Sequence, residues 1–222
     1  MTAIGTVVSA RTASIRLPAK AFRLLDDVPM IVFLLERLRS TRKGGKLIFA
    51  TTQRRDDDKL AELVGGLGIP VFRGADSDVA DRYLAAAKEF GLEFIVRVTG
   101  DCPFVDADSL DACIAQWSAE SASDIFTTKG VFPVGIDFEL FSTLVLEREW
   151  PKMTAEEREH LTLRFYRQDL GFSISRFEPP ADWPVVSHPF VVDTIADLKQ
   201  ASRLVSRLGR HFTVRQLLDE VA

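Results

Sequence analysis

Residues 46–74, KLIFATTQRRDDDKLAELVGGLGIPVFRG, hold the alternation that decides the fold. Two short, nearly continuous apolar runs, 46–52 and 69–73, indicate buried strands. The amphipathic stretch 56–64 between them is acidic in its first turn, which favours a helix. Strands buried on both faces and joined by helices are typical of a parallel sheet with helices on both sides, so this unit predicts an α/β fold.

The same alternation extends to both sides of this unit. The first half predicts further strands at 4–10 and 94–99 and helices at 29–40, 77–90 and 108–117, with Ser77 as an N-cap. The less regular second half predicts strands at 124–128, 136–141, 172–177 and 190–193, and helices at 142–150, 155–168, 196–208 and 213–221. We therefore expect a three-layer α/β fold with a mostly parallel sheet, formed by residues 1–222 as one domain.

The composition argues against several classes of protein. A hydrophobic fraction of 46% and a charged fraction of 27% are ordinary for a globular domain, and the net charge of −4 argues against a nucleic-acid partner. No apolar run approaches the ~20 residues needed to span a bilayer, and the first residues lack the features of a signal peptide. Cys102 and Cys113 fit reduced thiols. We expect a cytoplasmic protein that binds neither nucleic acid nor membrane.

The loop after the first predicted strand, ARTASIRLPAK at 10–20, is rich in cations. It lies at the carboxyl end of a strand, where open α/β sheets bind ligands. Arg11, Arg16 and Lys20 suit phosphate oxygens, although a solvated basic loop would explain the same residues. Neither GxxxxGK[ST] nor GxGxxG occurs, so this is neither a Walker loop nor a dinucleotide-binding turn.

Two aspartates hold equivalent positions after apolar runs. Asp101 follows the predicted strand 94–99, and Asp193 follows a short apolar run and precedes a predicted helix. A carboxylate at the carboxyl edge of a sheet is well placed to hold Mg²⁺ against triphosphate oxygens, and capping of a turn is the alternative.

Further polar residues share predicted faces elsewhere in the chain. Strand alternation puts Asp137 and Glu139 on one face, which an exposed strand would also explain. Arg158 and Thr162 share one face of a predicted helix. Asp78, near a helix start, could bind substrate or nucleotide oxygens or simply cap the helix.

Several of these stretches, in register from about Val8 to Leu198, resemble the sugar-acid (acylneuraminate-type) cytidylyltransferases. The match is closest to the spore coat polysaccharide biosynthesis protein F branch of that family. The stretches are ARTASIRLPAK (10–20), RGADSDV (73–79), VRVTGDCPFVD (96–106), FPVGIDFE (132–139), REHLT (158–162) and VDTIADLKQ (192–200).

The resemblance implies a nucleotide-diphospho-sugar transferase fold and a homodimer. It also implies Mg²⁺-dependent transfer of CMP from CTP to a sugar acid, with release of pyrophosphate, in surface polysaccharide biosynthesis. The nucleotide-binding half would be about 1–125, the substrate and dimer region about 126–185, and 186–222 would return to the sheet.

The resemblance also assigns roles to individual residues. Those implied to bind the nucleotide are Ala10, Arg11, Ser14, Arg16, Lys20 and Asp101. Arg11, Lys20 and Asp101 would be catalytic, and Asp101 and Asp193 would bind Mg²⁺. Those implied to bind the sugar acid are Asp78, Asp137, Glu139, Arg158 and His160.

Three residues of the basic loop depart from the family pattern. Ala13 and Ala19 stand where glycine is frequent, and Ile15 stands where serine is. Alanine resists positive φ at a cost of about 1 kcal/mol or more. A catalytically impaired nucleotide-binding relative is therefore one alternative, and a glycosyltransferase that uses a nucleotide-sugar is another. The acidic run 56–58 is better explained by helix capping than as a glycosyltransferase DxD motif.

Overall fold

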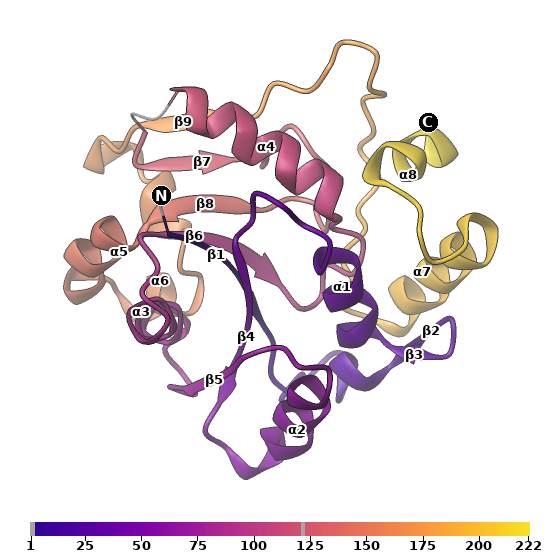
Figure 1. The fold of residues 1–222 in the computed structure, drawn as a ribbon, viewed down its shortest axis with the longest axis horizontal. Helices are drawn as coiled ribbons and strands as arrows, with labels where there is room; N and C mark the ends of the chain where they lie inside the picture. Colours follow the sequence, from indigo (N-terminus) through magenta and orange to yellow (C-terminus); the bar gives the residue numbers. More distant parts are fainter. Residues whose placement is uncertain (1–2, 121–122) are drawn as a thin grey trace.

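A seven-stranded sheet forms the centre of the computed structural model, which describes residues 3–120 and 123–222 (Figure 1). Its strands lie in the order β5-β4-β1-β6-β8-β7-β9. They are β1 (Ile4–Ser9), β4 (Lys46–Thr52), β5 (Val71–Gly74), β6 (Phe94–Thr99), β7 (Ile125–Thr127), β8 (Glu139–Ser142) and β9 (Ile174–Arg176). Strands β5 to β6 are parallel, β8 is antiparallel to both β6 and β7, and β7 pairs in parallel with β9. The expected mostly parallel sheet is confirmed.

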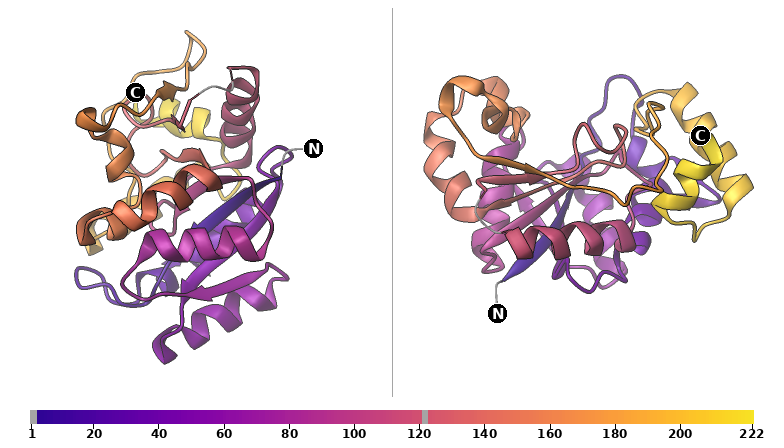
Figure 2. Two further views of the ribbon diagram at one scale, coloured as in Figure 1. Left: turned by 90° about the vertical axis from the view of Figure 1, so that its left-hand side faces the viewer. Right: turned by 90° about the horizontal axis from the view of Figure 1, so that it is seen from above.

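Helices cover both faces of this sheet and complete three layers (Figure 2). Alternate side chains of one strand enter different cores, as Val7 and Val8 of β1 do. The core on the Val8 side includes α1 (Met30–Leu38), α2 (Asp58–Gly66), α4 (Ala107–Glu120), α7 (Ile195–Leu208) and α8 (Val214–Val221). The core on the Val7 side includes α3 (Val79–Glu89), α5 (Thr143–Glu149) and residues that flank α6 (Ala155–Glu159). Among the described residues no helix is long and apolar enough to cross a membrane.

Shorter elements complete the chain. A two-stranded hairpin, β2 (Leu24–Leu25) and β3 (Val28–Pro29), precedes α1 and contacts α7. The 3₁₀ helices are η1 (Lys20–Phe22), η2 (Arg55–Asp57), η3 (Trp150–Lys152), η4 (Leu163–Tyr166) and η5 (Gln168–Leu170). The cap of α3 is Asp78 rather than the expected Ser77, because the Asp78 carboxylate accepts the Asp81 N–H at 2.8 Å.

The strand expected at 190–193 does not form. Pro189 has no backbone N–H to donate, and the next N–H groups bond to two separate segments. The Phe190 N–H donates to the Val134 carbonyl at 2.7 Å, and the Val192 N–H donates to the Asp101 carbonyl at 2.9 Å. Two isolated bonds make no ladder, but the second places Asp193 beside the end of β6.

The helix expected over 155–168 stops after one and a half turns. The chain leaves α6 at His160 with a non-helical backbone and continues as 3₁₀ turns. The break allows Thr162 to bond to Glu139 at 2.8 Å and Arg164 to pair with Glu149 at 3.0 Å. These tertiary partners are far away in sequence, so local periodicity could not indicate the break.

Candidate functional site

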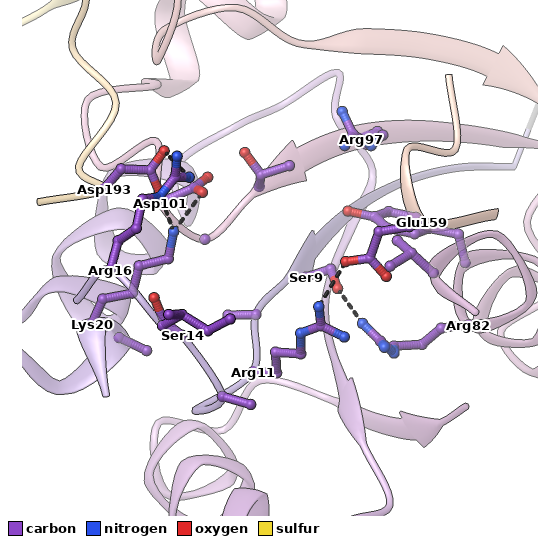
Figure 3. Close-up of a pocket in the computed structure, with 18 residues that line it drawn as sticks. Ser9, Arg11, Ser14, Arg16, Lys20, Arg82, Arg97, Asp101, Glu159 and Asp193 are labelled. Atoms are coloured by element: carbon purple, nitrogen blue, oxygen red, sulfur yellow. Dashed lines mark hydrogen bonds and ion pairs between the residues drawn. The ribbon is translucent and has the colours of Figure 1, made fainter. Parts of the chain in front are cut away.

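A pocket of about 520 Å³ opens at the carboxyl ends of β1 and β6 (Figure 3). The two strands are neighbours in parallel register, so their last residues, Ser9 and Thr99, lie side by side. The pocket lies where open α/β sheets bind ligands. The residues that the sequence assigned to nucleotide and metal all line it: Ala10, Arg11, Ser14, Arg16, Lys20, Asp101 and Asp193. The fold thus brings together side chains up to 177 positions apart, as in the Arg16–Asp193 contact.

The basic loop at 10–20 is tied down at two places. Leu17 is buried in the core, and Thr12 donates from its backbone N–H and its hydroxyl to Asp57 Oδ1, both at 2.7 Å. Asp57 also accepts the Thr52 hydroxyl at the end of β4. Burial raises the pKa of Asp57, but the hydrogen bonds from Thr12 and Thr52 outweigh it, so the pKa lies below its ordinary value. Asp57 occupies the N-cap position of α2, as expected of the run 56–58, but its carboxylate bonds to Thr12 and Thr52 and makes no cap bond to the helix.

The last turn of the loop has a left-handed residue. Ala19 adopts φ 53° and ψ 37°, a region that favours glycine, and directly precedes Lys20. The conformation turns the chain into η1 and leads Lys20 toward the carboxylates (Figure 3). The alanine singled out in the sequence therefore occupies a position where its Cβ is unfavourable.

Lys20 joins the two aspartates at one end of the pocket. Its Nζ lies 2.7 Å from Asp101 Oδ2 and 2.9 Å from Asp193 Oδ1, and Arg16 Nη2 lies 2.7 Å from Asp193 Oδ2. Burial lowers the pKa of Lys20, but the charge of Asp101 and hydrogen bonds to both aspartates raise it above its ordinary value. Burial raises the pKa of Asp101, but the Lys20 charge and the hydrogen bonds from Lys20 and Thr99 together bring it below its ordinary value. Both groups are therefore charged at neutral pH.

Asp101 and Asp193 fit a magnesium site that substrate phosphates would complete. Their oxygens converge on a single cation, the Lys20 ammonium, in the way that a shared metal would require. Mg²⁺ in proteins is commonly held by one or two carboxylates together with phosphate oxygens and water. Across residues 3–120 and 123–222, no group of three or more His, Cys, Asp or Glu gathers to hold a metal. Any further Mg²⁺ ligands would have to be of another kind, such as phosphate oxygens and water.

A second group of cations lines the other end of the pocket. Arg11 Nη2 pairs with Glu159 Oε1 of α6 at 2.7 Å, and Arg11 Nη1 donates to the Asp76 carbonyl at 3.0 Å. Arg82 of α3 donates to Ser9 Oγ at 3.1 Å and also bonds to the Asp76 carbonyl at 2.9 Å. Arg11 thus links the basic loop to both the α3 side and the second half of the chain.

The residues assigned to the sugar acid lie outside the pocket lining. Asp78 forms an ion pair with Arg158 at 2.7 Å. His160 is an exposed residue at the end of α6. Asp137 precedes β8 and accepts the Gly135 N–H at 2.8 Å, so it does not share a strand face with Glu139. Glu139 itself is fully buried and pairs with Arg97 at 2.9 Å. Their substrate roles stay predictions.

The lining residues that were given no role from the sequence include Arg82, Arg97, Thr99 and Glu159. A signal for Arg97 existed, since it is the one charged residue in the strand FIVRVT. Alternation would also have put Thr99 on the same face. Arg82 lies in a polar helix and gave no comparable signal, whereas Glu159 lies within the stretch REHLT (158–162) but was given no role there.

Comparisons with known proteins identify the family of the chain. The chain matches the family model described as cytidylyltransferase over residues 6–202. Spore coat polysaccharide biosynthesis protein SpsF of Bacillus subtilis is 28% identical over 209 residues, covering 91% of this chain and 86% of the relative. The 3-deoxy-manno-octulosonate cytidylyltransferase of Geobacter sulfurreducens is 33% identical over 128 residues, covering 57% of this chain and 50% of the relative.

A solved structure extends the likeness to three dimensions. A cytidylyltransferase from Leptospira borgpetersenii matches with a TM-score of 0.90 and 30% identity, covering 100% of this chain and 94% of that one. The resemblance inferred from the motifs is confirmed. Because the family model spans most of the sequence and the fold agrees throughout, the chain belongs to the cytidylyltransferase family.

Proposed function

We propose that the protein transfers CMP from CTP to a hydroxyl group of a sugar acid and releases pyrophosphate, as a step in surface polysaccharide biosynthesis. The observation that carries the proposal is the convergence of Arg11, Arg16 and Lys20 with Asp101 and Asp193 in one pocket. Membership of the family and the names of the two relatives support the substrate classes. We place the reaction in the cytoplasm because CTP is a cytoplasmic metabolite.

In the proposed reaction the acceptor oxygen attacks the α-phosphorus of CTP. A new P–O bond forms, the bond to the β-phosphate oxygen breaks, and the electron pair leaves with pyrophosphate, while the hydroxyl proton passes to solvent. Arg11, Arg16 and Lys20 would bind the triphosphate and neutralise the charge that grows on the leaving group. Most of the rate would come from positioning and from this electrostatic stabilisation.

Asp101 and Asp193 are the residues that would hold Mg²⁺. The chemistry that the ion supplies is neutralisation of phosphate charge and orientation of the triphosphate. The support is the convergence of the two carboxylates, and the remaining ligands would come from phosphate and water. The Lys20 ammonium lies between the two carboxylates, and its charge offsets the repulsion between them.

A pyrophosphate-release assay with CTP, Mg²⁺ and a panel of nonulosonic and related sugar acids tests the proposal. Asp101→Asn should lower kcat at least about 100-fold, because its oxygen would no longer carry the charge that the metal requires. Asp108→Asn, the same change at an exposed residue a few positions along, is the matched control and should leave the rate unchanged. Thermal unfolding of both variants reports whether the fold is intact.

The outcomes separate the alternatives. Calorimetric CTP–Mg²⁺ binding without turnover of any acid would identify a catalytically impaired relative, a reading motivated by Ala13, Ala19 and Ile15. Consumption of a nucleotide-sugar without pyrophosphate release would identify a glycosyltransferase. No binding of CTP at millimolar concentration would overturn the proposal, and so would a fully active, folded Asp101→Asn variant.

A further inference from the structure

Arg97 lies in the middle of β6, where the neighbouring side chains are apolar. Its side chain is 15% exposed and lies on the same sheet face as Ile95, toward α3. Strand register puts it directly opposite Glu139 of β8, and Arg97 Nη1 lies 2.9 Å from Glu139 Oε2. A charged side chain that is largely withdrawn from water is stable only where its donors find acceptors.

Glu139 is supplied with partners on both of its oxygens. Its Oε1 accepts from Thr162 at 2.8 Å, from Tyr166 at 3.4 Å and from the Lys129 ammonium, and its Oε2 accepts from Arg97. Two cations thus flank one carboxylate. This carboxylate needs no further donor, and its partners hold it opposite Arg97.

Arg97, in contrast, uses only one end of its guanidinium. Among the hydrogen bonds that the described residues form, its side chain takes part through Nη1 alone, and its Nε is buried without a partner. The edge of the guanidinium formed by Nε and Nη2 is therefore left without a protein acceptor. That planar edge matches the two oxygens of a carboxylate. The ion pair with Glu139 satisfies Nη1 of Arg97 and leaves the Nε–Nη2 edge without a partner among the described residues.

The position of Arg97 shows where such a carboxylate would lie. Arg97 lines the pocket and stands four residues before Asp101 on the same strand and its exit turn (Figure 3). Its partner Glu139 belongs to the second half of the chain, and Glu159 of that half also lines the pocket. Arg97 therefore stands where the strand that leads to Asp101 meets the second half of the chain, within the pocket.

We propose that Arg97 binds the carboxylate of the sugar acid through its Nε–Nη2 edge, and that Glu139 is the positioning residue that holds its guanidinium. This inference rests on the function proposed above. In an ulosonic acid the carboxylate is attached to the carbon that carries the reacting hydroxyl, so anchoring the carboxylate also orients that hydroxyl. The same contact would make the enzyme select acids over neutral sugars, because a neutral group would leave the guanidinium unpaired.

The test uses the full chain, CTP, Mg²⁺ and whichever acid of the panel supports turnover, together with the carboxamide of that acid. Arg97→Gln should raise KM for the acid roughly 10- to 100-fold and leave KM for CTP unchanged. The wild-type protein should prefer the acid over the carboxamide by a similar factor, and Arg97→Gln should abolish the preference. Arg97→Lys should restore it in part, because it keeps the charge without the planar edge.

Removal of Arg97 alone leaves Glu139 buried with one partner fewer, so the variant could fail to fold. The double variant Arg97→Gln/Glu139→Gln removes both charges together and should fold and show the same loss of acid preference. Glu139→Gln alone should raise KM for the acid with a smaller effect than Arg97→Gln, as expected of a residue that acts through Arg97.

Each outcome decides between the two proposals. If the wild type turns over an acid and the folded Arg97 variants keep the same acid preference, the role of Arg97 is overturned. The proposed function still stands in that case. An equal loss of CTP affinity and acid affinity would also overturn it, since it would place Arg97 at the nucleotide. CTP binding by wild type without turnover of any acid would overturn the proposed function, and the role of Arg97 with it.

Discussion

Replacement of Ala19 by glycine should stabilise the protein. Ala19 has φ 53° and an exposed side chain, so loss of its Cβ removes backbone strain and little packing. The left-handed region costs an L-residue about 1–2 kcal/mol relative to glycine. The greater conformational entropy of glycine in the unfolded chain lowers the free energy of unfolding by about 0.4–1 kcal/mol. The net gain should be about 0.5–1 kcal/mol, which for a chain of 222 residues is a rise in Tm of about 1–4 °C.

Calorimetry or circular dichroism on Ala19→Gly and Ala13→Gly side by side measures this effect. Ala13 is exposed on the same loop and is not among the described non-glycine residues with positive φ. Ala13→Gly should therefore lower Tm, by about 1–4 °C, because only the unfolded-state term operates. Equal shifts of the same sign in both variants would refute the reasoning, since they would show that the backbone conformation at residue 19 does not matter.

Two further predictions concern the carboxylates around the loop. Asp57→Asn should lower the free energy of unfolding by about 1–3 kcal/mol and weaken CTP binding, because the amide cannot accept all the bonds from Thr12 and Thr52. Calorimetric CTP titration and thermal unfolding measure both effects, and unaltered CTP affinity would show that the tether does not position the loop. Because the folded-state pKa of Asp101 lies below its unfolded value of about 3.9, its contribution to stability is complete above that pH and is lost as the pH falls through the folded pKa. Urea unfolding between pH 5 and 2 should show this loss in wild type and a shallower one in Asp101→Asn; identical slopes would contradict it.

The sequence was sufficient for the parallel half of the fold because local patterns determine it. Short, nearly continuous apolar runs such as 46–52 indicate strands buried on both faces, and the helices between them carry their own periodicity. Predictions failed where tertiary contacts outweigh local pattern. The apolar run at 190–193 looks like a strand, yet its N–H groups are taken by Val134 and Asp101, which lie in different parts of the fold.

The part of the site that follows strand ends was predictable, and the part that depends on tertiary packing was not. Residues that follow the strand ends, such as Lys20 and Asp101, could be placed because strand ends in a parallel sheet share one edge. Arg97 and Glu159 enter the pocket from within a strand and from a helix, and their approach depends on the packing of the second half. The ion pairs Arg97–Glu139 and Arg11–Glu159 both cross between the halves, a relation that no spacing in the sequence expresses.

The reversed strand β8 explains why the second half can contribute to the pocket at all. A further parallel strand beside β6 would need a crossover connection of a dozen or more residues, usually a helix. The antiparallel β8 instead enters at the carboxyl end of β6, with Glu139 as its first residue, and so places Glu139 opposite Arg97. The chain can then continue directly through α5 into α6, which delivers Glu159 to Arg11 on the face of α3. The change of strand direction thus joins the edge that carries the basic loop and Asp101, which local patterns build, to a second wall of the pocket that only the tertiary fold creates.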